Sequence, residues 1–278
     1  MAIPNAAARI AVSTWSLHKM LGTTYPHRLD STAIGPREET YGEGTTSLLD
    51  IPSAIANHHI DRLEIVSFHL PSRDPVYLGE LRSALATAEV TLQTLLIDAG
   101  DISDPITSAR DTDWIWSWIE TANLLGAERA RVIAGKQKPT RDALDLSVKA
   151  LTTLSERNAG SPVRLTTENW FALLAEPAQV HYLLDKLDGR VGLNGDFGNW
   201  GGAGKYDDLR SIFGRAETCH AKGHFIDGKL DEADYGQCLQ AAEEAGYKGP
   251  YTLIFDADEP DEWAGIEIEK QFIEEVLG

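Results

Sequence analysis

Short apolar runs alternate with longer segments of helical periodicity along the whole chain. The runs are rich in aliphatic and β-branched residues, which is typical of buried parallel strands. They cover Arg9–Thr14, Arg62–Val66, Thr91–Ile97, Arg129–Ile133, Val163–Glu168, Gly192–Asp196, Glu217–His220 and Tyr251–Asp256. The segments between them have apolar residues at intervals of three and four, which predicts helices. These helices cover Thr46–His58, Tyr77–Ala88, Asp111–Leu125, Arg141–Arg157, Pro177–Leu187, Tyr206–Ile212, Tyr235–Ala245 and Asp261–Leu277.

Strands that alternate with helices in this way predict an α/β fold, here a closed (β/α)8 TIM barrel. A chain of 278 residues fits one such barrel, so we expect a single domain over residues 1–278. A doubly wound sheet is the alternative, but it needs a phosphate loop after the first strand, and STWSLHK (residues 13–19) is not one. The polar segment Gly22–Gly44 then lies at the barrel mouth, as either a lid or a mobile loop.

Ionisable residues stand at the ends of four successive predicted strands. The four end residues, on the fifth to eighth predicted strands in order, are Glu168, Asp196, His220 and Asp256. The sixth strand ends at the aspartate of LNGDFGNW (residues 193–200). A single aspartate there is explained by turn formation, because Asp caps turns. Four neighbouring strands about 4.8 Å apart bring their ends to one point, where crowded carboxylates repel one another. A divalent cation relieves this repulsion, and oxygen and imidazole ligands suit Mn²⁺, Mg²⁺, Co²⁺ or Zn²⁺.

Composition and charge exclude several classes of protein. The net charge of −18 and the pI near 4.8 argue against nucleic acid as a partner, because phosphate backbones require Lys and Arg. The two cysteines, Cys219 and Cys238, fit a reducing compartment. No signal peptide is apparent, and no apolar run reaches the length of a membrane span. We therefore expect a cytoplasmic protein that does not contact membranes.

The chain resembles the xylose isomerase-like barrel superfamily, and in particular its sugar phosphate isomerases/epimerases. Seven motifs in the same order carry the resemblance over nearly the whole chain: RIAVSTWS, RLEI, LLGAERARVIAG, VRLTTEN, VGLNGDFGNW, CHAKGHF and EAGYKGPYTL. Endonucleases of the same superfamily gather a histidine-rich zinc cluster. This chain lacks that cluster, and its charge does not suit DNA.

The resemblance implies a metal site and shows where this chain departs from the family. The metal ligands of the family correspond to Glu168, Asp196 and His220. Many relatives have a fourth ligand, a glutamate, where this chain has Ile254, so Asp256 is the candidate replacement. Two further positions, Trp170 and Asn199, hold residues where several relatives have histidine. The resemblance also allows a homo-oligomer, although the sequence carries no interface signature.

The resemblance further implies an enzyme that acts on a small sugar or keto-sugar by removing a proton next to a carbonyl, with an enediolate intermediate. Glu168 is the expected base, Asp256 the opposite group, and Lys222 a donor to a developing oxyanion or a leaving hydroxyl. The missing glutamate weakens a two-base epimerase, so a dehydratase or lyase of a keto-cyclitol or keto-glycoside and a non-catalytic sugar-binding barrel remain as alternatives. The expected contacts to the sugar are Trp15, His18, Glu64, Trp170, Asn199 and His224.

Two other motifs have simpler explanations. Trp114 and Trp118 share one helix face by their spacing, so we expect them in the core. GNWGGAGKY (residues 198–206) does not match the spacing of a phosphate loop, so we expect a flexible loop.

Overall fold

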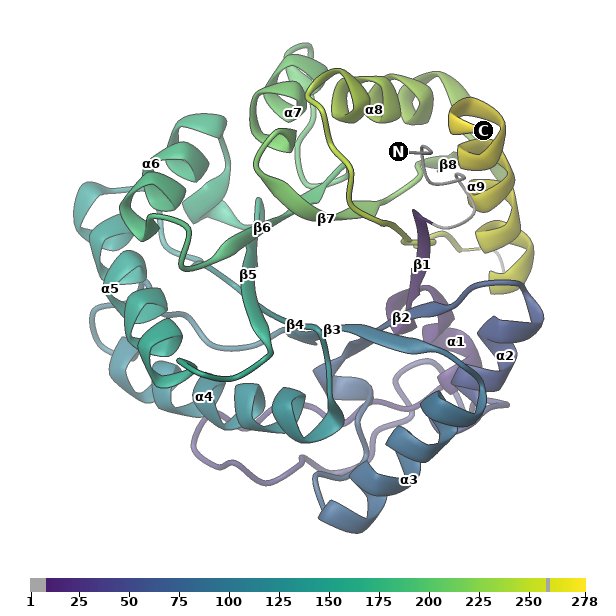
Figure 1. The fold of residues 1–278 in the computed structure, drawn as a ribbon, viewed down its shortest axis with the longest axis horizontal. Coiled ribbons are helices and arrows are strands. Elements are labelled where there is room, and N and C mark those ends of the chain that lie inside the picture. Colours follow the sequence, from purple (N-terminus) through teal and green to yellow (C-terminus); the bar gives the residue numbers. More distant parts are fainter. Residues whose placement is uncertain (1–8, 259–260) are drawn as a thin grey trace.

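The barrel closes through parallel pairing of eight strands in the order β1-β10-β7-β6-β5-β4-β3-β2, with helices around the outside (Figure 1). The computed structural model describes residues 9–258 and 261–278. The expectation about a signal peptide concerns mainly residues 1–8, which lie outside the described residues. The predicted TIM barrel is confirmed, and the doubly wound sheet is excluded because β1 pairs with both β2 and β10.

The bounds of the elements are as follows. The barrel strands are β1 (Ile10–Ser13), β2 (Arg62–Val66), β3 (Thr91–Ile97), β4 (Arg129–Val132), β5 (Arg164–Glu168), β6 (Gly192–Asp196), β7 (Ala216–Ala221) and β10 (Tyr251–Leu253). The α-helices are α1 (His18–Leu21), α2 (Ile51–Asn57), α3 (Pro75–Thr87), α4 (Ser108–Leu125), α5 (Arg141–Arg157), α6 (Pro177–Leu187), α7 (Lys205–Phe213), α8 (Glu232–Glu244) and α9 (Glu262–Leu277). Short 3-10 helices cover Thr14–Leu17, Ser67–His69 and Ala172–Leu174, and a hairpin is formed by β8 (Phe225–Ile226) and β9 (Lys229–Leu230).

The last barrel strand is shorter than predicted. Its pairing with the neighbouring strands runs from Tyr251 to Leu253, whereas the sequence predicted a strand that ends at Asp256. The Ser16 hydroxyl donates to the Leu253 carbonyl at 2.9 Å and accepts from the Phe255 amide at 2.9 Å. The side chain of Ser16 therefore takes the place of the next ladder hydrogen bonds, and the chain leaves the barrel before it reaches Asp256.

Helix starts also differ from the predictions, for reasons that lie in capping. The α8 helix starts at Glu232, earlier than expected, because the Asp231 side chain accepts a hydrogen bond from the Asp234 amide. The α2 helix starts only at Ile51, and the expected first turn from Thr46 forms a loop and turns instead.

The core lies between the barrel and its helices. Trp114 and Trp118 on α4 are 4% and 2% exposed, which confirms their assignment to the core. Among the described residues, no helix combines the length and the apolar character that crossing a bilayer requires.

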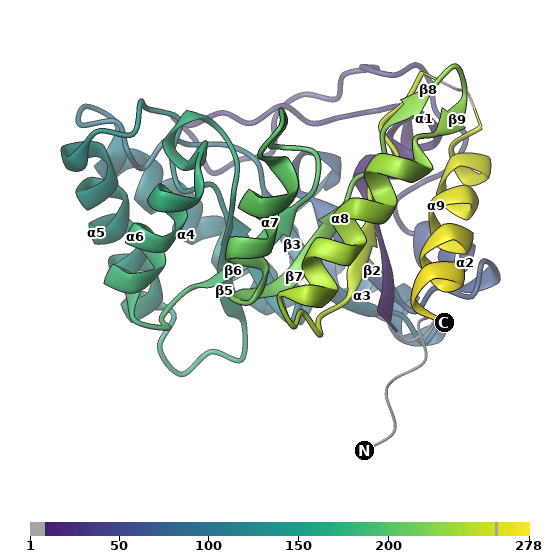
Figure 2. The ribbon, with the colours of Figure 1, turned by 90° about the horizontal axis from the view of Figure 1, so that it is seen from above.

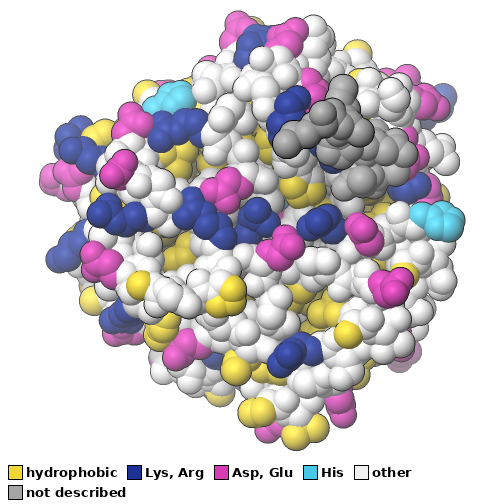
Figure 3. Space-filling view, in the orientation of Figure 1, with side chains coloured by type: hydrophobic (Ala, Val, Ile, Leu, Met, Phe, Trp, Pro, Cys, Tyr) yellow, Lys and Arg dark blue, Asp and Glu magenta, His cyan; other side chains and the backbone are white. Residues whose placement is uncertain are grey.

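Ion pairs close the end of the barrel at which the strands begin. Figure 3 shows basic and acidic side chains around the centre of one face. Arg62 and Arg129 both reach Glu128, at 3.3 and 3.1 Å, and Arg164 reaches Glu217 at 2.8 Å. Residues at this end of such barrels serve stability, while reactive groups gather at the opposite end.

The segment 22–44 crosses the end of the barrel at which the strands finish (Figure 2). It is fixed on its neighbours: His27 Nε2 lies 2.8 Å from Ser67 Oγ, and Trp114 Nε1 donates to the Ser31 carbonyl at 3.0 Å. Thr24 and Glu38 form a β-bridge within it. The segment is therefore tied to the α4 side of the barrel.

Candidate metal centre and active site

Three of the predicted strand-end residues converge inside the barrel. Glu168 and Asp196 are the last residues of β5 and β6, and His220 lies beside Asp196 on β7. All three are buried, and each offers a ligand atom within 4.8 Å of the other two. Two carboxylate oxygens and one imidazole nitrogen at this separation form a set of donors suited to a divalent cation.

His220 is held between carboxylates on both ring nitrogens. Its Nδ1 lies 3.5 Å from Glu168 Oε2 and 3.4 Å from Asp196 Oδ2, while its Nε2 lies 2.9 Å from Glu64 Oε2. Gln93 Nε2 donates to the other oxygen of Glu64 at 2.9 Å. When Glu64 accepts the Nε2 proton, the Nδ1 lone pair points toward Glu168 and Asp196, as in metal sites where a carboxylate orients a histidine.

The two carboxylate oxygens of Asp196, at the end of β6, have different contacts. Its Oδ1 accepts hydrogen bonds from the Gly198 amide at 2.6 Å and the Asn199 amide at 2.8 Å, which forms the turn after β6. Its Oδ2 is the oxygen nearest His220. The two explanations offered by the sequence are therefore compatible, because one oxygen caps the turn and the other faces the cluster.

Glu168 is the most heavily bonded carboxylate of the cluster. Its Oε2 lies 3.1 Å from Arg131 Nε, and its Oε1 accepts from Asn199 Nδ2 at 2.8 Å. Burial by itself would raise the pKa of Glu168, but the charges of His220 and Arg131 outweigh it and hold the pKa at about 2. Glu168 is therefore ionised at any physiological pH.

Two residues of the site were missed by the sequence analysis. Arg131 is buried within β4, and its Nη2 contacts Asp98 Oδ1 at 2.5 Å. Asp98 directly follows β3, so the same strand-end pattern that selected Asp196 could have found it. For Arg131 the only signal was a charge inside an otherwise apolar strand. Burial is the main cause that raises the pKa of Asp98, although Arg131 opposes it.

The cluster has an excess of negative charge that a cation would balance. Four carboxyl groups, those of Glu64, Asp98, Glu168 and Asp196, surround the single permanent cation Arg131 and the imidazole of His220. Burial alone would lower the pKa of His220, but Glu168 and Glu64 raise it well above its usual value. The residues therefore fit a divalent metal in both donor chemistry and charge.

Asp256 does not join this cluster. It lies three residues beyond the end of β10, and Lys222 Nζ contacts its Oδ2 at 2.5 Å. Both side chains are about one third exposed, at 33% for Lys222 and 34% for Asp256. Among the described residues, the group that brings ligand atoms together contains only Glu168, Asp196 and His220. The early end of β10 is the physical reason.

A cavity of about 100 Å³ opens above the cluster. Its lining consists of Ser13, Trp15, Val66, Leu96, Asp98, Arg131, Glu168, Trp170, Asp196, Asn199, His220, Lys222 and Ile254. Of the expected sugar contacts, Trp15, Trp170 and Asn199 line this cavity. The segment 22–44 contributes nothing to this lining.

The other expected sugar contacts lie elsewhere. Glu64 is fully buried behind His220, so it does not lie where a contact to the sugar was expected. His18 forms a second layer, with Nδ1 2.5 Å from the Trp15 carbonyl and its ring 4.1 Å from that of Tyr41. His224 lines a neighbouring groove.

Trp170 forms an aromatic wall of the cavity. The guanidinium of Arg131 lies 5.2 Å from its ring centroid, and Phe171 stacks on it with centroids 4.2 Å apart. Phe171 has a φ of 56°, a conformation that is uncommon for a bulky residue. The chain thus turns sharply at the pair Trp170 and Phe171, which directly follows Glu168 and Asn169.

Comparisons with known proteins agree with this fold. The family model described as xylose isomerase-like TIM barrel matches residues 54–275. A xylose isomerase-like TIM barrel protein from Mycobacterium smegmatis in complex with magnesium is 16% identical, with a TM-score of 0.67 over 97% of this chain and 98% of that chain. A D-tagatose 3-epimerase-like protein is 18% identical, with a TM-score of 0.68 over 97% and 98%.

A third solved structure, the 3-keto-D-glucoside 4-epimerase from E. coli, is 16% identical, with a TM-score of 0.63 over 81% of this chain and 94% of that chain. At such identities these likenesses establish the fold alone. The sequence matches no curated protein.

Proposed function

Because the chain belongs to the xylose isomerase-like TIM barrel family, we propose that it is a divalent-metal-dependent isomerase or epimerase of a small sugar or keto-sugar. One observation carries the proposal: the buried ligand atoms of Glu168, Asp196 and His220 lie within 4.8 Å of one another at the catalytic end of the barrel. Solved structures of sugar epimerases share this fold.

Glu168, Asp196 and His220 would hold the metal, and Glu64 would orient His220. Their oxygen and nitrogen donors suit Mn²⁺, Mg²⁺, Co²⁺ or Zn²⁺. When bound, such a cation polarises the substrate carbonyl and so acidifies the neighbouring C–H bond. Trp15 and Trp170 line the cavity and bound the space that the reacting end of the sugar enters.

Glu168 is the proposed base. Its carboxylate is ionised and so free to accept a proton, although the neighbouring charge of Arg131, which lowers the pKa of Glu168, also makes it a weak base. Glu168 is therefore suited to removing a proton from a C–H bond next to a polarised carbonyl, and not from an unactivated C–H bond. Lys222 is the proposed donor to an oxygen of the substrate. Its position in the lining of the same cavity and its contact with Asp256 support this role.

A lyase or dehydratase of a keto-cyclitol or keto-glycoside is the second candidate, and one observation favours it. A two-base epimerase needs a second proton-transferring group across the substrate, and the apolar Ile254 lines the cavity at the position where relatives have glutamate. Elimination and aldose–ketose isomerisation need only one base together with a proton donor. A sugar-binding barrel without catalysis is the remaining alternative.

The test combines elemental analysis with a substrate panel. Purified protein should contain about one equivalent of Mn, Co, Zn or Mg by mass spectrometry, and a Glu168→Ala, Asp196→Ala double variant should lose it. Ketoses, aldoses and inososes are then incubated with the metal-loaded protein in D₂O. An isomerase or epimerase incorporates deuterium at the reacting carbon, whereas a lyase forms an unsaturated ketone with ultraviolet absorption.

A matched pair of variants isolates the chemistry. Glu168→Gln should abolish turnover while the fold is kept, and Glu156→Gln on the exposed face of α5 should behave as the wild type. Full activity of Glu168→Gln would refute the mechanism. Sugar-induced thermal stabilisation without turnover on any member of the panel would favour the binding-protein alternative.

A further inference from the structure

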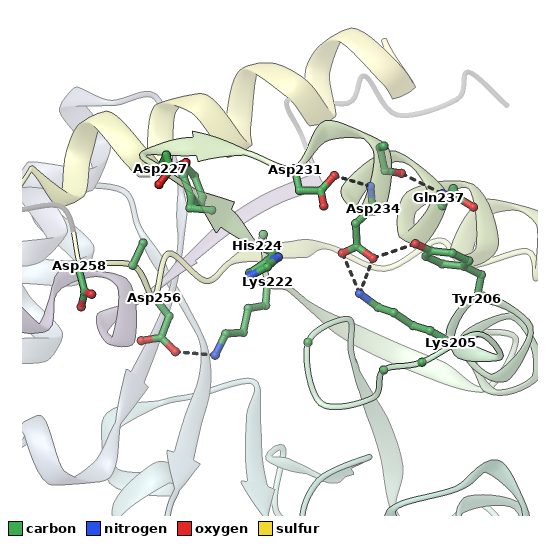
Figure 4. A pocket seen from close by; sticks show the side chains of 17 residues that line it. Lys205, Tyr206, Lys222, His224, Asp227, Asp231, Asp234, Gln237, Asp256 and Asp258 are labelled. Carbon is green, nitrogen blue, oxygen red and sulfur yellow. Dashed lines mark hydrogen bonds and ion pairs between the residues drawn. The ribbon is translucent and has the colours of Figure 1, made fainter.

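A second, larger hollow adjoins the central cavity. It is a groove of about 900 Å³ between the segments that follow β6, β7 and β10 (Figure 4). Lys222 lines both the groove and the central cavity. Figure 4 shows the ion pair of Lys222 with Asp256 apart from the contacts of Lys205 and Tyr206 with Asp234.

The two hollows differ greatly in size. Sites that enclose whole organic ligands measure about 300 to 1,000 Å³. The central cavity of about 100 Å³ lies below this range, and the groove of about 900 Å³ lies within it. The central cavity therefore fits the reacting end of a molecule, while the groove has room for a further unit of that molecule.

The charges of the groove oppose an anionic ligand. Its two lysines are already paired: Lys205 Nζ lies 2.8 Å from Asp234 Oδ2, and Lys222 is bound to Asp256. Three further carboxylates line the groove, and none of them forms an ion pair with a lysine or arginine in the described chain: Asp227, Asp231 and Asp258. The groove is thus electronegative, and a phosphate group would be repelled from it.

The groove instead offers acceptors for hydroxyl groups and aromatic surface. Asp227 stands at the two-residue turn between β8 and β9, where it has a φ of 50° and Gly228 has a φ of 73°. This turn holds the Asp227 carboxylate at the groove. Tyr206 and Phe225 also line the groove and supply aromatic surface suited to the apolar face of a sugar ring.

We propose that the substrate is an uncharged glycoside of at least two units, with its reacting sugar in the central cavity and its second unit in the groove. This inference rests on the proposed function, because it deepens the choice of substrate for the same site. It excludes sugar phosphates as good substrates. It also predicts that free monosaccharides bind more weakly than glycosides.

The test is to fill the groove. Gly201 lines it, and an added Cβ there meets no atom within 4 Å, so Gly201→Trp places an indole in the groove without a clash at its base. The control is Gly79→Trp on α3, where an added Cβ also meets nothing within 4 Å. The probes are maltose, cellobiose, trehalose, glucose and glucose 6-phosphate, and calorimetry measures each dissociation constant.

In the wild type and in Gly79→Trp, at least one disaccharide should bind about tenfold or more tightly than glucose, and glucose 6-phosphate should bind most weakly. Gly201→Trp should weaken that disaccharide by about tenfold or more and reduce its advantage over glucose. Three outcomes overturn the inference: no disaccharide binds better than glucose, Gly201→Trp leaves the disaccharide unaffected, or glucose 6-phosphate binds most tightly.

A second variant separates this inference from the proposed function. Glu168→Gln removes the proposed base but leaves the groove intact. If the proposed reaction is wrong and the groove assignment is right, Glu168→Gln and the wild type bind the same disaccharide and neither turns it over. If the reaction is right and the groove assignment is wrong, the wild type turns over monosaccharides and Gly201→Trp does not change disaccharide binding. Asp227→Asn, which keeps the turn, should weaken the disaccharide more than glucose.

Discussion

The Nε2 atom of His220 lies 2.9 Å from the Oε2 atom of Glu64, which is fully buried on the opposite side of the imidazole from Glu168 and Asp196. Glu64 comes from β2 and His220 from β7, so the contact crosses the interior of the barrel. Its effect is to fix the ring orientation and the tautomer. A residue that the sequence suggested as a sugar contact is thus placed to act through His220.

Glu64→Gln should therefore lower the affinity for metal. A glutamine can accept the Nε2 proton only through a neutral oxygen, so it holds the imidazole less firmly and leaves Nδ1 less basic. Loss of such a supporting carboxylate usually costs about 10- to 100-fold in metal affinity. The measurement is a titration of metal-free protein with Mn²⁺, in which electron paramagnetic resonance detects the free ion at each step.

Glu262→Gln is the matched control for that variant. Glu262 is also a buried glutamate, but it accepts hydrogen bonds from the Lys19 and Met20 amides, away from the cluster. Its replacement should leave the Mn²⁺ affinity unchanged. Equal affinities for Glu64→Gln and the wild type would show that Glu64 does not support the site.

Arg131 should be essential for stability. It is buried between Asp98 and Glu168, with contacts of 2.5 and 3.1 Å. Arg131→Met keeps much of the volume but leaves two buried carboxylates without their cation, and such a loss costs about 3–5 kcal/mol. Urea denaturation of the metal-free protein measures it. A double variant, Asp98→Asn with Arg131→Met, should recover part of the loss because one unpaired charge is removed.

Much of the fold could be predicted from the pattern of the sequence. The bounds of β2, β3 and β6 agree with the prediction. Mainly apolar residues mark β2 and β3, and β6 ends where Asp196 caps the following turn. The β8–β9 hairpin was missed, since its strands have only two residues each, although the Asp-Gly pair at residues 227–228 signals such a turn.

The site was only partly predictable, because its contacts depend on tertiary structure. Glu168, Asp196 and His220 could be found from strand ends alone. The pairing of Arg131 with Asp98 depends on the register of β3 against β4, which places Val132 beside Ile97 and cannot be read from either strand separately. The position of Asp256 depends on Ser16, a residue distant in the sequence that ends β10 early.

Gly198 should be required for the position of Lys222. A Cβ added to Gly198 would lie 2.7 Å from Lys222 Cδ and 3.1 Å from its Cγ, so Gly198→Ala must displace the lysine stem. We expect turnover to fall by about tenfold or more, because a positioned proton donor contributes about 100- to 10,000-fold and a displaced lysine loses part of that contribution. Stability should change little, because a partly exposed ion pair contributes about 0–1 kcal/mol.

Steady-state kinetics and thermal denaturation of the same samples measure the two effects of Gly198→Ala. The control is Gly79→Ala, where an added Cβ meets no atom within 4 Å. This variant should keep full turnover and gain slightly in stability, because alanine favours the helix by about 1 kcal/mol. Unchanged turnover of Gly198→Ala would argue against a role for Lys222.

Glu269 should make stability depend on pH. This α9 residue is fully buried; its Oε1 accepts from the Gly223 amide at 2.9 Å, and its Oε2 has no hydrogen-bond partner among the described residues. Burial raises the pKa of Glu269 from 4.5 to about 8, against the smaller opposing effects of the Gly223 amide and Lys222. Between these two pH values the folded state keeps a proton that the unfolded state has released.

The free energy of unfolding should therefore fall as pH rises from about 4.5 to about 8, with a contribution from Glu269 of about 1.4 kcal/mol per pH unit. Below this window both states are protonated, and above it both are ionised, so the contribution is constant. Glu269→Gln keeps the acceptor for Gly223 but cannot ionise. Its unfolding free energy, measured in urea at several pH values, should lose this slope. Glu274→Gln, which removes a partly exposed carboxylate from the same helix, should follow the wild type, and parallel curves for Glu269→Gln and the wild type would contradict the raised pKa.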